Sequence, residues 1–508
     1  MTDLLLAHDV GTTGAKTTLF DSSGALVASS FAPYPTHRPG PGAEEQDPND
    51  WWEAVCRGTR AVLSEHPGAS GRIAAVGMCA MMNGCVLVDT TGAHVRPALI
   101  HADIRSAEAA QRIAADVGWR RAYQLSGHRV APYYTLAKLA WLSEHEPATM
   151  RRARWCVQAK DCLASRLTGV VGVTDPSDAS LTGMLNMASG RWSDELIGAG
   201  RIERRLLPDI VPSTAVVGHV TQRAAAETGL LKGTPVVLGG GDGACATAGA
   251  GAVRPGDAYH YLGGTSWIAS LSARYVPDSA ARVSVLLGLA PGMYVTYGTV
   301  QTASAAVDWF RSAIGVGERE PGEDEHAALD RLVAGSPPGA NGLMFLPYLQ
   351  GERAPIWDPH ARGAFIGLTP AHTRADLARA VMEGVALALT SVLAVFEEKG
   401  AAPGAIRVLG GGMRYAVWRG ILASAYNRPL HVLTRLLQAT SSGAAMAAGV
   451  GVGLYPDLAA AAPLFAAVGS HETPDPGAAA LYARLAPFYR SLHPALAERF
   501  VALSALAP

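Results

Sequence analysis

Short apolar runs alternate with polar turns at the start of the chain. Residues 4–31 form three apolar runs, which are separated by Gly-Thr-Thr-Gly at 11–14 and by Asp-Ser-Ser-Gly at 21–24. This spacing predicts strand, turn, strand, turn, strand. The pattern returns in the middle of the chain, where two apolar runs flank Gly-Gly-Thr-Ser at 263–266. Two such hairpins, one at the head of each half, predict a duplicated unit.

Beyond the first hairpins, continuous apolar runs alternate with segments of helical periodicity. Apolar positions recur at helical spacing in 161–167 and 375–396, whereas 73–78 and 236–238 are unbroken apolar runs. This alternation predicts helices that cover a sheet, an α/β arrangement. Residues 171–190 are rich in Asp, Ser, Thr and Gly. We expect a loop or a β-excursion there.

Length and charge limit the possible organisation and partners. A chain of 508 residues is too long for one compact core, so we expect two domains. The turn-rich segment 253–257 marks their junction and predicts domains at 1–252 and 253–508. The 42 Lys and Arg residues nearly balance 43 Asp and Glu residues, with no long run of either sign. We therefore expect binding neither to nucleic acid nor to an anionic membrane.

Nothing in the sequence predicts export or membrane insertion. Asp3 stands where a signal peptide requires positive charge, and the most apolar region, 443–465, is interrupted by Pro456. That region is expected to form a tightly packed helix and its successor. The six cysteines form no C-x-x-C pair, and no histidine lies at zinc-ligand spacing from any of them. We expect buried free thiols in a cytoplasmic protein.

An aspartate follows a run of glycines close to the middle of the chain. The apolar run 236–238 leads into three glycines at 239–241 and then into Asp242. Glycines let the backbone approach a ligand closely, and one carboxylate at a strand end is what activation of a hydroxyl requires. The competing interpretation of Asp242 is an Asx turn or a helix N-cap. Its surroundings must decide between the two.

Glycine-containing turns are candidates for nucleotide binding. Thr12 and Thr13 lie in the first turn, with Asp9 before it and Lys16 after it. Such a turn can hold phosphate oxygens while Asp9 positions a hydrated Mg2+, although the same residues suit an ordinary hairpin. Three more glycines at 410–412 would let a base or ribose lie against the backbone. A plain loop between strand and helix is the alternative there.

Two longer patterns give the chain a family likeness. Residues 133–145 read Tyr-x-Thr-x-x-Lys-Leu-x-Trp-Leu-x-Glu-His. Residues 363–368 read Gly-x-Phe-x-Gly-Leu and lead to Asp-Leu-x-x-Ala-Val-Met-Glu at 376–383. With these patterns the chain resembles the FGGY carbohydrate kinases, and among them most closely the xylulokinases.

The resemblance implies two actin-like, ribonuclease H-like domains with ATP between them and the sugar deep in the cleft. The N-terminal domain would be the sugar-binding side and the C-terminal domain the nucleotide-binding side. Asp242 would be the catalytic base, and Asp9 would hold the hydration shell of Mg2+. The implied ATP contacts are Thr12, Thr13, Lys16, Gly263, Gly264, Thr265, Ser266, Gly411 and Gly412, and the implied substrate contacts are Met82, Asn83, Asp103, Asp242 and Gly243.

Three stretches depart from the xylulokinase pattern. Asn83 replaces the histidine of Gln-Met-His-Gly, and Gly243 replaces the asparagine that follows the catalytic aspartate. Where xylulokinases carry Trp-Asn-Asp-Gly-Arg, residues 101–105 read His-Ala-Asp-Ile-Arg. Loss of a polar partner can change substrate selectivity by orders of magnitude. On sequence alone, Asp103 and Arg105 also suit a surface ion pair or a helix cap.

Together these features predict ATP-dependent phosphorylation of a primary hydroxyl on a small sugar or polyol, such as the ketopentose D-xylulose. The alternative acceptors are erythritol-, glycerol- or ribulose-like compounds. An alternative of another class is a non-catalytic actin-like module that senses nucleotide or sugar. Such a module would be expected to carry an added interaction segment, and the sequence shows no basic N-terminal helix-turn-helix. The resemblance is also compatible with a homodimer.

Overall fold

Contacts divide the protein into two compact units. The computed structural model describes residues 3–506. Unit 1 comprises the chain up to Arg254 together with Ala273–Val295 and Gln438–Ala466, and the remaining segments form unit 2. The predicted division into 1–252 and 253–508 differs from this grouping, because it assigns Ala273–Val295 and Gln438–Ala466 to the second domain.

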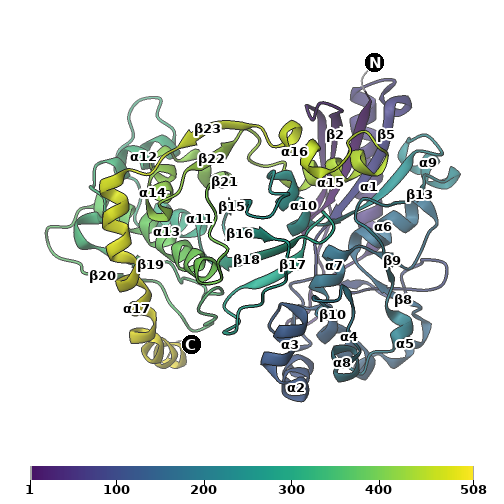
Figure 1. Cartoon of the computed structure of the whole chain (residues 1–508), viewed down its shortest axis with the longest axis horizontal. Helices are drawn as coiled ribbons and strands as arrows, with labels where there is room; N and C mark the ends of the chain where they lie inside the picture. The colour runs from purple at the N-terminus through teal and green to yellow at the C-terminus, as the bar shows by residue number, and fades with distance from the viewer. Residues whose placement is uncertain (1–2, 507–508) are drawn as a thin grey trace. The chain divides into compact units, whose positions relative to one another are not determined.

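Unit 1 is built on a six-stranded sheet with the order β13-β14-β5-β1-β2-β3 (Figure 1). In chain order its strands are β1 (Leu4–Val10), β2 (Gly14–Asp21), β3 (Leu26–Pro33), β5 (Ile73–Ala80), β13 (Val216–His219) and β14 (Pro235–Gly241). The first three strands form antiparallel hairpins, which confirms the prediction for 4–31. β5 lies parallel to both β1 and β14, so the carboxyl ends of these three strands lie at the same edge of the sheet.

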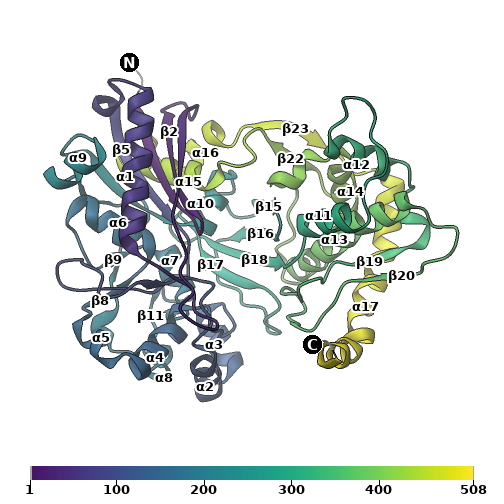
Figure 2. The ribbon, with the colours of Figure 1, turned by 180° about the vertical axis from the view of Figure 1, so that it is seen from behind.

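Helices cover both faces of this sheet. α1 (Pro48–Glu65) and α6 (Ala159–Thr168) pack on one face, where Figure 2 shows α1 running along the strands, and α15 (Ala439–Gly451) packs on the other. α15 lies so close that a Cβ on Gly77 of β5 would be 2.2 Å from the carbonyl oxygen of Ala444. The prediction of a tightly packed small-residue helix is confirmed, and its successor is α16 (Leu458–Phe465).

Shorter helices complete unit 1. They are α2 (Ala107–Val117), α3 (Trp119–Ser126), α4 (Thr135–His145), α5 (Pro147–Arg152), α7 (Pro176–Leu181), α8 (Asp194–Ala199), α9 (Gln222–Thr228) and α10 (Asp242–Gly249). Within 171–190, where we expected a loop or a β-excursion, the short strands β9 (Val173–Thr174) and β10 (Leu185–Asn186) lie on either side of α7. Its six residues are too few to show a helical period. The signals that do mark it are Asp175 as N-cap and Pro176 in the first turn.

The sheet of unit 2 repeats the order of the first. Six of the seven strands of the second sheet run β18-β16-β15-β21-β22-β23. β15 is antiparallel to β16 and parallel to β21, β22 is parallel to β21, and β23 is antiparallel to β22. The bounds are β15 (Ala258–Leu262), β16 (Ser266–Ser272), β18 (Tyr294–Val300), β21 (Ile406–Leu409), β22 (Leu430–Leu433) and β23 (Val468–Glu472). β15, β21 and β22 thus correspond to β1, β5 and β14. The predicted duplication is confirmed.

Five α-helices pack on the second sheet or on one another. They are α11 (Ser304–Ala313), α12 (Glu325–Ala334), α13 (Arg374–Glu398), α14 (Ala416–Tyr426) and α17 (Pro476–Leu506). α17 packs on α13 and α14 (Figure 1). Among the described residues, α13 is the one helix long and apolar enough to cross a membrane, but most of its apolar stretch is buried inside the protein. All six cysteines are buried and free, as predicted.

The glycines before Asp242 are required by packing within unit 1. Gly239 has a φ of 66°, and a Cβ there would lie 1.7 Å from the carbonyl oxygen of Met78 in β5. A Cβ on Gly241 would lie 2.4 Å from the side chain of Met82. We expected these glycines to admit a ligand. The structure corrects that interpretation, because the atoms that approach them belong to the protein.

We expect Gly239→Ala to lower the free energy of unfolding by about 2 kcal/mol or more, because the new Cβ combines an unfavourable φ with a backbone clash. Gly243→Ala is the matched control, since its Cβ would make only ordinary contacts, 3.5 Å from Leu286. Denaturant titration of both variants measures the difference. Equal stabilities would contradict the packing role of Gly239.

Candidate active site

The carboxyl ends of β1, β5 and β14 bring three predicted site residues to one edge of the first sheet. Asp9 lies near the end of β1, Asn83 follows β5, and Asp242 follows β14. In the strand register Asp9 pairs with Cys79, which in turn pairs with Gly240. Ligands bind at this edge in open α/β sheets.

Asp242 is the first residue of α10 and is only partly exposed. Its Oδ1 accepts a hydrogen bond from the backbone N of Gly243 at 2.7 Å. Burial and, secondarily, the negative charge of Asp9 raise the pKa of Asp242 to about 7, against the opposing effect of the Gly243 bond. Gly241 occupies the N-cap position, so the competing cap interpretation does not describe Asp242. A carboxylate with a pKa near neutrality is suited to accept a proton in catalysis.

The raised pKa predicts a pH dependence. Asp242 must be deprotonated to act as a base, and its deprotonated fraction in the free enzyme increases as pH rises through about 7. We therefore expect kcat/KM to rise with pH, to reach half of its maximum near the pKa of about 7 and to level off about one pH unit above it. Steady-state rates between about pH 5.5 and 8.5 at constant Mg2+ measure the profile. A flat profile over that range would contradict this role.

Asp9 is held by side chains from three elements of unit 1. Its Oδ2 accepts a hydrogen bond from the hydroxyl of Thr440 in α15, and its Oδ1 lies 3.7 Å from the Sγ of Cys79. Lys16 lies opposite Asp9 in the pairing of β1 with β2. Burial raises the pKa of Asp9, while Thr440 and the charge of Lys16 oppose that shift.

The carboxylates of Asp9 and Asp242 fit a divalent cation. Both are partly exposed, and the charge of one raises the pKa of the other, so a cation near them would relieve their repulsion. Mg2+ is commonly held by one or two carboxylates together with substrate phosphates. Among residues 3–506 no cluster of three or more His, Cys, Asp or Glu side chains could hold a metal ion by itself. Asp9 and Asp242 would supply the one or two carboxylates of such a Mg2+ site.

The turn at 11–14 presents two hydroxyls. Thr12 and Thr13 are exposed. Gly11 N donates to the carbonyl oxygen of Gly14 at 3.0 Å and closes the turn, and the Gln46 side chain donates to the carbonyl of Thr12 at 2.8 Å. Backbone contacts thus hold the turn while both threonine side chains reach solvent, as a phosphate-binding turn requires.

Asn83 combines a strained backbone with an unpaired acceptor. It has a φ of 63°, and its carbonyl oxygen accepts a hydrogen bond from Lys138 Nζ at 2.6 Å. Its side-chain Oδ1 is buried and has no hydrogen-bond partner in the described chain. Both features are typical of binding sites. Met82 lies beside Gly243, since its Sδ is 3.6 Å from the position of a Cβ there.

Asp103 is fully buried, and both of its carboxylate oxygens contact protein groups. Oδ2 accepts hydrogen bonds from Glu44 N at 2.9 Å and from the Arg105 guanidinium at 2.8 Å, and Oδ1 accepts one from Arg105 Nε at 3.3 Å. Arg105 also contacts Glu45. Asp103 and Arg105 thus form an ion pair, but a buried one and not the surface pair that we considered. Asp103 presents no exposed oxygen to a substrate.

In unit 2, only part of the turn at 263–266 is exposed and free to contact a phosphate. Gly264 and Thr265 are exposed, whereas Ser266 is buried. The Ser266 hydroxyl donates to the carbonyl oxygen of Tyr261 at 2.7 Å and pairs with His260 Nε2 at 2.8 Å. The predicted contact of this hydroxyl with phosphate therefore needs correction, because it is used within the sheet.

Two of the three glycines at 410–412 are required for packing, and the third lies in open space. Gly410 has a φ of 103°, and a Cβ there would lie 2.5 Å from the carbonyl oxygen of Leu262. A Cβ on Gly412 would lie 2.5 Å from the Leu262 side chain. A Cβ on Gly411 would meet nothing within 4 Å. Gly411 thus offers open backbone, whereas Gly412 is required for packing against β15.

Ser304, which the sequence interpretation missed, lies beside both of these turns. Its backbone N donates to the carbonyl oxygen of Gly263 at 2.9 Å, and its Oγ is 3.0 Å from the position of a Cβ on Gly412. That Oγ is buried and has no hydrogen-bond partner in the described chain. A serine at the start of a helix is too common a signal to have identified it.

Family profiles match most of the chain. Residues 4–249 match the FGGY family of carbohydrate kinases, N-terminal domain, and residues 260–452 match its C-terminal domain. The chain belongs to the FGGY family of carbohydrate kinases. The family resemblance predicted from the sequence is confirmed, and the protein is an enzyme that phosphorylates a carbohydrate.

The relatives of this FGGY kinase include enzymes with different acceptors. The xylulose kinase of Escherichia coli (strain K12) is 31% identical over 431 residues, which cover 85% of this chain and 86% of that protein. The gluconokinase of Bacillus subtilis (strain 168) is 28% identical over 509 residues, which cover 99% and 98%. The crystal structure of xylulose kinase from Rhodospirillum rubrum has a TM-score of 0.90 at 32% identity, covering 98% of this chain and 99% of that chain. The predicted two-domain actin-like α/β fold is confirmed, and a non-catalytic module is not supported.

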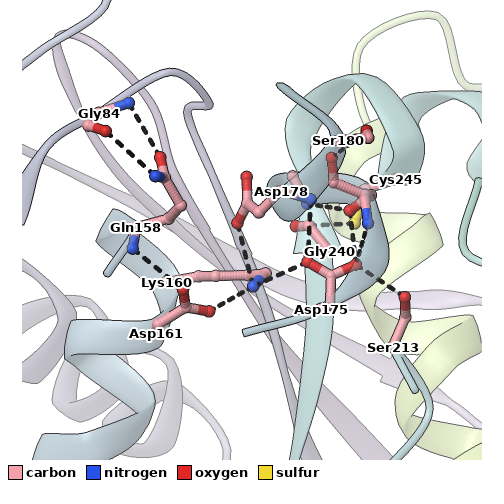
Figure 3. A network of polar contacts seen from close by, with 12 residues as sticks. Gly84, Gln158, Lys160, Asp161, Asp175, Asp178, Ser180, Ser213, Gly240 and Cys245 are labelled. Carbon is pink, nitrogen blue, oxygen red and sulfur yellow. Dashed lines mark hydrogen bonds and ion pairs between the residues drawn. The ribbon is translucent and has the colours of Figure 1, made fainter. Parts of the chain in front are cut away.

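In this FGGY kinase a buried polar cluster lies beside β14, the strand that directly precedes Asp242 (Figure 3). Lys160 Nζ lies 2.5 Å from Asp161, 2.9 Å from Asp175 and 3.0 Å from Asp178. All four side chains are at most 1% exposed. Burial raises the pKa of Asp178 well above its usual range, whereas for Asp175 the charge of Lys160 and hydroxyl contacts outweigh burial and lower the pKa. The sequence interpretation missed this cluster.

Proposed function

We propose that this carbohydrate kinase transfers the γ-phosphoryl group of ATP to a primary hydroxyl of a small sugar or polyol, with the ketopentose D-xylulose as first candidate acceptor. The observation that carries the proposal is the position of Asp242 at the end of β14, with a pKa raised to about 7 by burial and by Asp9. Phosphoryl transfer asks a protein mainly for positioning, charge stabilisation and one group that accepts the hydroxyl proton.

In the proposed reaction, the oxygen of the acceptor hydroxyl forms a bond to the γ-phosphorus while Asp242 takes the proton from that hydroxyl. The bond between that phosphorus and the bridging oxygen of ADP breaks, and ADP leaves. The exposed hydroxyls of Thr12 and Thr13 would hold phosphate oxygens. In unit 2, Thr265 and Gly411 remain candidates for contacts with the nucleotide.

Mg2+ is the metal that suits this site, with Asp9 as its protein anchor. When bound, the ion neutralises charge that develops on the transferring phosphate. Asp9 keeps its place through the hydroxyl of Thr440 and the pairing of β1 with β2. Its charge also keeps the pKa of Asp242 high in the absence of a cation.

Asn83 and Gly243 are the positions on which we expect acceptor choice to depend. The unpaired Oδ1 of Asn83 is a ready partner for a substrate hydroxyl. Gly243 contributes no side chain, which leaves room beside Asp242 for a group that an amide would otherwise contact. The gluconokinase relative makes D-gluconate the second candidate acceptor.

ADP formation with a panel of acceptors tests the proposed function. The panel contains D-xylulose, D-ribulose, D-gluconate, glycerol and erythritol, with purified full-length protein and MgATP. We expect the highest kcat/KM with D-xylulose. In Asn83→His, the ratio of kcat/KM for D-xylulose to kcat/KM for D-gluconate should change about tenfold. ADP formation that does not depend on any of these acceptors would contradict the proposed substrate class. An unchanged ratio for Asn83→His would remove Asn83 from the substrate site.

A further inference from the structure

The buried cluster around Lys160 is connected to the end of β14, which directly precedes the proposed base, and to the turn after β5, which contains the proposed substrate residue. We propose that Lys160, its three aspartates, Gln158 and Ser177 form one positioning framework that fixes the end of β14 and the turn after β5. Figure 3 shows Gln158 and Gly84 on one side of Lys160 and Asp175, Ser213 and Gly240 on the other. The inference rests on the proposed function, because it concerns how Asp242 and Asn83 are held.

The connection to β14 passes through Asp175 and Ser177. Lys160 Nζ contacts Asp175 Oδ1 at 2.9 Å, and the Ser177 hydroxyl donates to Asp175 Oδ2 at 2.6 Å. The Ser177 Oγ in turn accepts a hydrogen bond from the backbone N of Gly241 at 3.0 Å. Gly241 directly precedes Asp242. The buried charge of Lys160 is therefore linked by three contacts to the residue next to the proposed base.

A second serine ties the same strand to Asp175. The Ser213 hydroxyl donates to Asp175 Oδ2 at 2.8 Å, and the Ser213 carbonyl accepts a hydrogen bond from Gly239 N at 2.8 Å. One carboxylate oxygen of Asp175 thus fixes two serines, which hold backbone groups on either side of Gly240. Because Gly240 also has no room for a Cβ, the strand end has little freedom to move.

The connection to β5 passes through Asp161 and Gln158. Asp161 contacts Lys160 with Oδ1 and accepts a hydrogen bond from Gln158 N with Oδ2 at 3.0 Å. The Gln158 amide then contacts both backbone groups of Gly84, accepting from its N at 2.9 Å and donating to its O at 3.1 Å. Gly84 directly follows Asn83. The substrate-side turn is therefore held by a two-point contact.

A fully buried charged cluster is an expensive way to stabilise a fold, because apolar residues of similar volume usually serve as well. Its arrangement around the strand ends instead gives fixed geometry. A catalytic group displaced by about 1 Å can lose about a hundredfold in rate. The cluster acts through Asp242 and Asn83 and touches no reacting atom in this account, so its members are positioning residues.

Ser177→Ala tests the arm that leads to the base. It removes the hydroxyl that accepts the hydrogen bond from Gly241 N, and it leaves the ion pairs of Lys160 with its three aspartates in place. We expect kcat to fall about tenfold while KM for ATP and for the acceptor changes little. Ser180→Ala is the matched control: it removes another buried hydroxyl from α7, one that contacts the Ser177 carbonyl and Leu287 N. The control should keep kcat. Equal kcat for the two variants would overturn the inference.

Hydrogen exchange gives a readout that needs no substrate. We expect the amides of 239–243 to exchange faster in Ser177→Ala than in wild type or Ser180→Ala, because Gly241 N loses its partner. Unchanged exchange there would also overturn the inference.

Gln158→Met tests the arm that leads to the substrate turn. It preserves side-chain length but removes both contacts with Gly84. We expect KM for the acceptor to rise about tenfold, with KM for ATP little changed. An unaltered KM for the acceptor would show that this arm does not position the turn.

A double variant separates this inference from the proposed function. If Ser177 acts through Asp242, Ser177→Ala should reduce the residual rate of Asp242→Asn by less than twofold, in contrast to about tenfold in wild type. A fully active Asp242→Asn would overturn the proposed base itself. An inactive Asp242→Asn together with a fully active Ser177→Ala would overturn only the framework.

Discussion

Asp242→Asn is expected to lower kcat by about a thousandfold while leaving the binding of ATP and acceptor nearly unchanged. The amide matches the carboxylate in shape and can still accept the hydrogen bond from Gly243 N, so α10 should begin as it does in the wild type. What it loses is the ability to take the hydroxyl proton. The effect should therefore appear in kcat, measured at saturating MgATP and acceptor.

Cys245→Ala is a suitable control for Asp242→Asn. Cys245 lies in the same helix, and its Sγ contacts the carbonyl oxygen of Gly240. It carries no charge that the mechanism uses, so its kcat should stay close to that of the wild type. An Asp242→Asn protein as active as this control would exclude Asp242 as the base.

Asp9→Asn is expected to have the second largest effect, a loss of about a hundredfold in kcat together with a requirement for more Mg2+. The substitution removes the charge proposed to anchor the metal. It also removes one of the causes of the raised pKa of Asp242, so the acidic limb of the kcat/KM profile should move to lower pH. Rates measured as a function of Mg2+ and of pH test both consequences.

Thr440→Val is the matched control for Asp9→Asn. It removes the hydroxyl that donates to Asp9 Oδ2 but keeps the carboxylate and its charge. The Mg2+ concentration for half-maximal rate should then rise much less than in Asp9→Asn. If Asp9→Asn shows the same Mg2+ dependence as the wild type, Asp9 does not anchor the metal.

The regular features of the fold could be predicted because they rest on local patterns. Alternating apolar runs and turns identified the first hairpin and its copy, and the register of both sheets confirms the duplication. The small-residue composition of 443–465 indicated a closely packed helix, and α15 indeed lies against Gly77. That this late segment groups with unit 1 depends on tertiary contacts, which no local pattern contains.

The sequence located the candidate site more reliably than it assigned individual contacts. It identified Asp9, Asn83 and Asp242, because each follows or ends an apolar strand whose carboxyl end can face a ligand. It could not tell that the Ser266 hydroxyl points back into its own sheet or that Asp103 is enclosed by Arg105 and Glu44. Side-chain direction within a turn is decided by packing.

The polar cluster around Lys160 was missed for a different reason. Its members come from the start of α6 and from the N-cap and first turn of α7, two segments that are separated in sequence. α7 itself is too short to show a helical period. A lysine and three aspartates read as ordinary surface charges until the fold buries them together. Such a cluster becomes visible only when long-range contacts are known.

Proton-coupled phosphorus NMR of the reaction products tests the central claim most directly. Wild type and Asp242→Asn are incubated at equal concentration with MgATP and, in separate samples, D-xylulose or D-gluconate. The account predicts that wild type forms a phosphomonoester whose signal is coupled to the proton pair of a primary carbon, and that Asp242→Asn forms almost none in the same time. Release of inorganic phosphate without any ester, or equal ester formation by both proteins, would contradict it.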